Sequence, residues 1–277
     1  IILVFMFNYM PMFGISIAFK SFNYGKGILG SPWCGLDNFK MLITNMNVTS
    51  RIVRNTLGYY FLFTAVGTVA NVALAIALYE CVFKRYAKVT QTIMIMPTFI
   101  SFIAVTYIVN ALLNNATGMF NNILKSMGKS PINWYLSPQY WPTILTVVNV
   151  WKGTGYGSIM YLSALSGMDQ EIFEAAQIDG ATKGQQIRYI TLPMLTGMIC
   201  ILLLLGLGGI MHSNTGLHYQ VTKNVGLLYS TTQTIDAFIL NALTSGTSNF
   251  GMNAAVTFFQ SVVGCVMVVV TNLIVRR

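Results

Sequence analysis

The chain has 277 residues, of which 55% are hydrophobic and only 8% are charged. Soluble domains carry a charge at about a quarter of their positions, so this composition excludes a water-soluble protein and places the chain in a lipid bilayer. The net charge of +9 would suit a nucleic-acid-binding protein, but the Lys and Arg residues are scattered over loops and form no basic stripe. We therefore expect no nucleic-acid partner.

Apolar runs of about twenty residues, the length that crosses a hydrocarbon core, recur along the chain. They predict an all-α membrane protein with about six transmembrane helices in one domain, 1–277. The predicted spans cover residues 1–19, 57–79, 92–113, 142–165, 195–211 and 254–275. The first run starts at Ile1 and has no A-x-A-like cleavage site, so we expect a true first span and a native N-terminus that extends further.

Basic residues indicate how the spans are oriented. Lys84, Arg85 and Lys88 follow the second span, and Arg276 and Arg277 close the chain. With six alternating spans, both groups fall on one side together with a polar loop at about 168–193. The positive-inside rule places that side in the cytoplasm.

The polar loop is predicted to fold as two short helices. Asp169 is a candidate N-cap for the first, and Gly180 stands where a left-handed residue would end it. Thr182 and Gln185 match a capping box that starts the second helix. Leu192-Pro193 should then stop that helix near Tyr189. Two helices joined by a glycine form a knob that a partner outside the membrane can bind.

The order of residues in this knob resembles the EAA loop of the permeases of binding-protein-dependent ABC importers. The matching positions are Glu174, Ala175, Ala176, Asp179, Gly180, Ala181, Ile190, Leu192 and Pro193. The resemblance implies a MetI-like, type I architecture in which these residues couple the permease to an ATPase. It further implies a multi-pass protein of the bacterial cytoplasmic membrane, a second homologous permease, two ATPase subunits and an extracytoplasmic solute-binding protein.

The chain has no phosphate-binding loop of its own. Its Gly-Lys-Ser, at Gly128 to Ser130, has Ile123 where such a loop requires a glycine. We therefore expect no cofactor in this chain and no enzymatic activity, with ATP and Mg²⁺ bound by the partner ATPase subunits.

The fourth predicted span carries an unusual polar sequence. Lys152 is its one cation, and Gly153, Gly155 and Gly157 follow closely. A charge within a membrane is unfavourable unless it faces a cavity or a partner. Lys152 could therefore face a hydrated pathway, or it could snorkel or pair with a helix C-terminus while the glycines allow close helix packing. The sequence leaves both alternatives open.

A second resemblance favours a pathway. Asn149, Trp151, Gly153 and Tyr156 match the N-x-W-x-G-x-x-Y pattern of carbohydrate-importer permeases of the MalF and LplB type, which bind sugar in this span. The polar residues in the next span of the family correspond here to Gly206, Ile210 and Ser213. This half of the family's sugar-binding pocket therefore differs in this chain. The resemblance implies that Asn149, Trp151, Lys152, Gly153, Tyr156, Gly206 and Ser213 line the pathway.

These observations predict a permease subunit that imports oligosaccharides or polysaccharide fragments. Lys152 raises the hypothesis that the substrate carries carboxylate groups, with a neutral oligosaccharide as the alternative. An ABC permease for a non-sugar substrate also remains open. A secondary transporter is the rival from another class, but between Leu57 and Met168 the chain has no acidic residue except Glu80 with which to bind a coupling ion.

Overall fold

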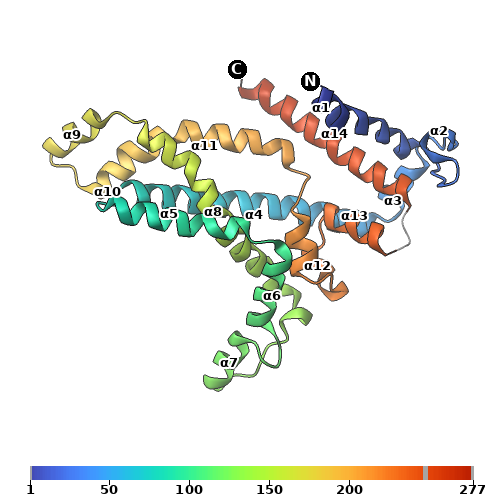
Figure 1. The fold of residues 1–277 in the computed structure, drawn as a ribbon, viewed down its shortest axis with the longest axis horizontal. Helices are drawn as coiled ribbons and strands as arrows, with labels where there is room; N and C mark the ends of the chain where they lie inside the picture. The colour runs from blue at the N-terminus through green and yellow to red at the C-terminus, as the bar shows by residue number, and fades with distance from the viewer. Residues whose placement is uncertain (1, 246–248, 276–277) are drawn as a thin grey trace. The chain divides into compact units, whose positions relative to one another are not determined.

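The computed structural model describes residues 2–245 and 249–275, and these residues form helices joined by loops, with no named β-strand (Figure 1). The all-α prediction is therefore confirmed for the described part of the chain. Arg276 and Arg277, used above to infer the orientation, lie outside the described residues.

The chain divides into two compact units, and each is assembled from separate segments. Unit 1 comprises residues 1–60, 106–141 and 207–277, and unit 2 comprises residues 61–105 and 142–206. The long helix α4, Met46–Tyr79, and the shorter α6, Phe102–Leu113, contribute to both units.

Besides the first part of α4, unit 1 contains mostly short helical elements and one long helix. They are α1 (Ile2–Val4), η1 (Phe5–Tyr9), η2 (Met10–Phe19), α2 (Gly27–Gly30), η3 (Asp37–Phe39), α3 (Lys40–Thr44), α7 (Met119–Ser126), η4 (Trp134–Leu136), η5 (Pro138–Tyr140), η7 (Leu207–Gly209), η8 (Gly216–Val221), η9 (Gly226–Leu228), α12 (Tyr229–Thr232), α13 (Ile235–Thr244) and α14 (Phe250–Val275). Ile52, Ile235 and Val256 belong to its buried core.

Unit 2 contains longer helices and the predicted knob. Besides the second part of α4 it has α5 (Lys84–Phe99), α8 (Trp141–Ser166), α9 (Gln170–Ile178), α10 (Lys183–Gln186), η6 (Ile187–Thr191) and α11 (Leu192–Gly206). Its core includes Val72 and Ala75 of α4, Tyr161 and Leu165 of α8 and Leu195 of α11.

Three helices among the described residues are long and apolar enough to cross a membrane: Met46–Tyr79, Lys183–Gly209 and Phe250–Leu273. The pair α5 and α6 adds a fourth if it is counted as one bent span. Helix α8 has 26 residues but a lower mean hydropathy, because Lys152, Asn149 and its glycines interrupt the apolar sequence. The helix Phe5–Phe19 is shorter. Helices thus occupy most of the described residues of all six predicted spans, except for the break at 100–101 and the turn at 210–211.

The third predicted span is not one continuous helix, as residues 92–113 had suggested. Helix α5 ends at Phe99, α6 begins at Phe102, and the two helices meet at 99°. Pro97 lies in the last turn of α5, and Ile100 is extended with φ −71° and ψ 128°. A proline weakens a helix because it has no N–H to donate, and the Ser101 hydroxyl then accepts from the Ala104 N–H at the start of α6. This pair is a broken span or a re-entrant loop.

Candidate functional site: the knob and the α8 face

The knob folds largely as its sequence predicted. The Asp169 carboxylate accepts from the Glu171 N–H at 3.0 Å and caps α9. Gly180 has φ +79°, a left-handed conformation that disfavours any residue with a Cβ. Thr182 and Gln185 form the expected capping box at the start of α10. Local capping chemistry is sufficient to position both helices.

The predicted stop at Leu192-Pro193 is wrong. The helix that begins at Lys183 continues to Gly209, passing through a π-helical turn, η6, directly before Leu192. Pro193 has no N–H for an ordinary α-helical bond, and its ring would clash with the carbonyl one turn earlier. The wider π turn accommodates the proline. The knob is therefore continuous with a candidate membrane span, so movement of α10 can be passed directly to α11.

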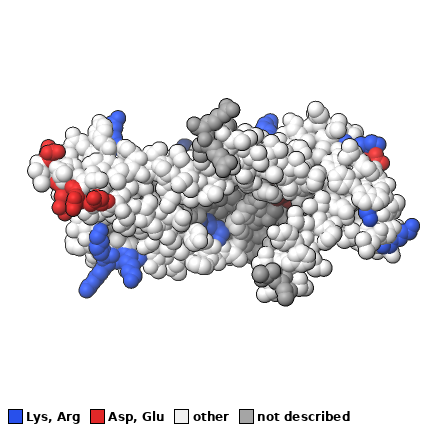
Figure 2. Space-filling view, turned by 90° about the horizontal axis from the view of Figure 1, so that it is seen from above, with Lys and Arg blue, Asp and Glu red and all other residues white. Residues whose placement is uncertain are grey.

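The knob presents a charged, exposed surface. Glu174, Ala175, Asp179 and Gly180 are exposed, and Ala176 and Ala181 are half-buried. Figure 2 shows the acidic side chains gathered at the α9 end of unit 2, with basic side chains close by. A recess of about 290 Å³, lined by residues that include Asp179, Gly180 and Tyr189, lies beside these residues. The small side chains and the recess allow a partner surface to approach closely.

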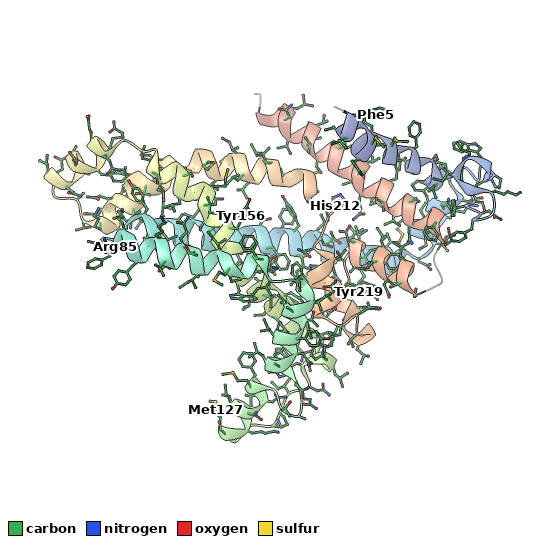
Figure 3. All side chains as sticks on the ribbon, viewed as in Figure 1. Phe5, Arg85, Met127, Tyr156, His212 and Tyr219 are labelled. Atoms are coloured by element: carbon green, nitrogen blue, oxygen red, sulfur yellow. The ribbon has the colours of Figure 1, made fainter. Side chains whose placement is uncertain are left out.

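Two contacts that sequence reasoning missed connect the knob to the end of α4. The Gln170 Nε2 donates to the Tyr79 hydroxyl at 2.5 Å, and Lys183 Nζ lies 3.1 Å from Glu80 Oε2. Figure 3 labels Arg85 at the start of the next helix, α5. The one signal in the sequence was Glu80, an isolated acid next to a loop of basic residues. These contacts connect α9 and α10 to the end of α4.

Helix α8 presents an exposed face that carries three of the predicted pathway residues. Asn149 is half-buried, Gly153 is exposed, and Tyr156 is 63% exposed. Figure 3 labels Tyr156. Their spacing of four and then three residues places them on one side of a helix. Trp151 is 40% exposed and points from a different side of α8. The structure describes these positions, and their contact with a substrate stays a prediction.

The Lys152 ammonium binds the end of α5. Its Nζ donates to the carbonyl oxygens of Pro97 and Thr98 at 3.0 and 2.8 Å and to that of Ile100. In return, the Thr98 hydroxyl donates to the Lys152 carbonyl at 2.8 Å. An ammonium has three N–H donors, and all three are used here. The structure therefore shows Lys152 pairing with a helix C-terminus, where a cation is favourable, and its place in the pathway stays a prediction.

The remaining predicted pathway residues lie elsewhere in the chain. Gly206 is the last residue of α11, directly before η7. Ser213 belongs to unit 1, where its N–H and its hydroxyl donate to Asp236 Oδ2 at 2.6 and 3.1 Å. Gln260 Nε2 donates to the other oxygen of Asp236 at 3.3 Å. The Ser213 hydroxyl thus takes part in a polar network around α13 and α14.

A helical membrane protein with one broken or re-entrant span and a charged knob that continues into a span is typical of a transport permease. Residues 82–277 match the family described as "Binding-protein-dependent transport system inner membrane component". The chain belongs to this family, and its expected kinship with ABC importer permeases is confirmed.

Several relatives are similar over nearly the whole chain. The polygalacturonan/rhamnogalacturonan transport system permease protein YteP of Bacillus subtilis is 30% identical, covering 98% of this chain and 84% of YteP. Protein LplB of the same organism is also 30% identical, with the same coverage. A subunit in the crystal structure of a bacterial ABC transporter that imports the acidic polysaccharide alginate has a TM-score of 0.88 at 32% identity, covering all of this chain and 92% of that one.

Proposed function

We propose that this permease carries an oligosaccharide, preferably one with carboxylate groups, across the bacterial cytoplasmic membrane. The structural observation that carries this proposal is the exposed α8 face with Asn149, Gly153 and Tyr156, because amides and an aromatic ring suit sugar hydroxyls and ring faces. The names of its relatives support the same class, since they include transporters of polygalacturonan and alginate. Other relatives are named for neutral sugars such as lactose and maltose.

The proposed assembly contains two permeases, two ATPase subunits and an extracytoplasmic binding protein. The Glu174 to Gly180 surface would contact the ATPase, which binds ATP and Mg²⁺ and supplies the energy. A structure related to this chain is described in complex with an alginate-pentasaccharide-bound periplasmic protein, which supports a binding-protein partner here. Closure of the ATPases would move the knob, and with it α4 and α11, so that access to the α8 face alternates between the two sides of the membrane.

The test combines purification with transport. Native co-purification followed by mass spectrometry should recover an ATPase and a second permease. Vesicles containing the complex should take up a uronic-acid tetrasaccharide faster than a neutral tetrasaccharide. A lone homo-oligomer would instead support a secondary transporter. A complete complex that transports no saccharide would favour a non-sugar substrate.

A further inference from the structure

A polar cleft of about 190 Å³ lies within unit 2 between the facing sides of α4 and α8. Helix α4 contributes Thr64, Thr68 and Asn71, which are spaced by four and then three residues and so share one face. Helix α8 contributes Asn149 and Thr154. The other lining residues are Phe63, Gly67, Val150 and Gly153. By the liquid volume of water, the cleft has room for about six water molecules.

The glycines around this cleft differ in what surrounds them. A Cβ added at Gly67 or Gly153 would meet no atom within 4 Å, so both positions face open space. At Gly155 it would lie 1.8 Å from the Met94 carbonyl oxygen, and at Gly157 it would lie 2.5 Å from the Asn71 amide nitrogen. Gly155 and Gly157 therefore allow close helix packing, whereas Gly67 and Gly153 leave the cleft open.

One polar group of the cleft, the side-chain oxygen of Asn71, is not used in packing the two helices together. The Thr68 hydroxyl bonds Tyr161 of α8, and the Thr154 hydroxyl donates to the Val150 carbonyl of its own helix at 2.7 Å. The Asn71 Oδ1 is buried and accepts no hydrogen bond from the described residues. A buried acceptor without a partner is unfavourable by about 1–3 kcal/mol, and polar residues in spans are rare unless they face a cavity or a partner. Interhelical contact would place such an amide against a donor on the other helix. An open cleft with an unused acceptor instead indicates a ligand that supplies hydroxyl groups.

The lining also restricts the chemistry of that ligand. It contains amides, threonine hydroxyls and the ring of Phe63, but no Lys or Arg. A carboxylate would have no cation to bind there, while neutral hydroxyls can both donate to and accept from these groups. An aromatic ring beside polar groups is also typical of small-ligand pockets.

We propose that the cleft between α4 and α8 holds one sugar ring of the transported oligosaccharide through its hydroxyl groups. This inference rests on the proposed function and extends it, because it assigns α4 residues Thr64, Thr68 and Asn71 to the substrate site. Those residues carry no motif, and the sequence had marked only α8. The cleft binds ring hydroxyls, and any selectivity for carboxylates arises elsewhere.

The experiment fills the cleft without disturbing the protein around it. In Gly67→Leu the added side chain enters open space, so it should occupy the cleft rather than displace a neighbour. Gly58→Leu is the matched control, because Gly58 lies on the same helix, is exposed and also has no atom near its Cβ position. Binding of a fluorescent uronic-acid tetrasaccharide would be measured on purified transporter in nanodiscs without the binding protein, together with the melting temperature and the co-purified subunits.

Gly67→Leu should weaken binding at least about tenfold, the equivalent of about 1.4 kcal/mol, and leave the melting temperature and subunit composition unchanged. Gly58→Leu should bind as the wild type does. Thr64→Val, which keeps the side-chain shape and removes one hydroxyl, should weaken binding several-fold and provides a second test should Gly67→Leu misfold.

Three results would overturn the inference. Unchanged binding in both Gly67→Leu and Thr64→Val would mean that the cleft faces lipid. Loss of a partner subunit from Gly67→Leu would identify the cleft as a protein interface. Equal weakening in Gly58→Leu would show a general effect on α4. If the wild type itself binds and transports no saccharide, the proposed function fails as well, and this outcome is distinct from the other three.

Discussion

Replacing Lys152 by methionine tests whether this residue anchors the bend between α5 and α6 or binds substrate directly. The substitution keeps the length of the side chain and removes the ammonium that donates to the carbonyls of Pro97, Thr98 and Ile100. It also removes the cation 4.9 Å from the centre of the Phe102 ring. The end of α5 then loses its only charged donor among the described residues.

The expected loss of unfolding free energy follows from these contacts. Hydrogen bonds to a charged group contribute about 1.5–3 kcal/mol each, but three that share one ammonium are not additive. The Pro97 carbonyl also keeps the Ile100 N–H as a donor at 3.2 Å. We therefore expect a loss of about 2 kcal/mol of unfolding free energy, which lowers the melting temperature by roughly 4–8 °C for a protein of this size.

The assay measures the melting temperature of the purified protein and the uptake of acidic and neutral tetrasaccharides. Lys152→Met should lower the melting temperature and slow the uptake of both substrates to a similar extent, because the bend shifts for either one. Lys125→Met, at an exposed lysine in the last turn of α7, is the control for losing a charge and should change neither. An unchanged melting temperature with loss of acidic uptake alone would refute this reasoning and identify Lys152 as a carboxylate ligand.

Three further predictions concern coupling, orientation and pH. Glu174→Lys reverses a charge on the exposed knob and should abolish uptake and substrate-stimulated ATPase activity while the protein level in the membrane stays normal; full activity would contradict this role. A cysteine at Ser126 should react with an impermeant reagent from outside, and one at Lys183 only after permeabilisation; the reverse pattern would invert the orientation. Burial lowers the pKa of His218 to about 4 from its usual 6.5. The unfolding free energy should therefore fall by about 2 kcal/mol as the pH is lowered from about 8 to 5, because the unfolded chain binds the proton first. His218→Gln should flatten this pH dependence in thermal melts, and an unchanged slope would contradict it.

Sequence by itself determined the features that depend on composition and on neighbouring residues. Apolar runs identified the membrane helices because a bilayer selects for length and hydropathy. The knob was equally readable, since the Asp169 cap, the left-handed Gly180 and the capping box of Thr182 each involve residues within one or two turns of each other.

Only the tertiary structure decided what the polar residues inside the spans contact. The partners of Lys152 lie more than fifty residues away, so no local pattern could choose between a cavity and a helix end. The same holds for Gly67 and Gly155, which look alike in sequence although one faces open space and the other packs on the Met94 carbonyl. Pro193 continues a helix that it was expected to end, because a π turn before it relieves the clash. In each case the outcome depends on how helices pack, and helix packing is set by side chains distant in sequence.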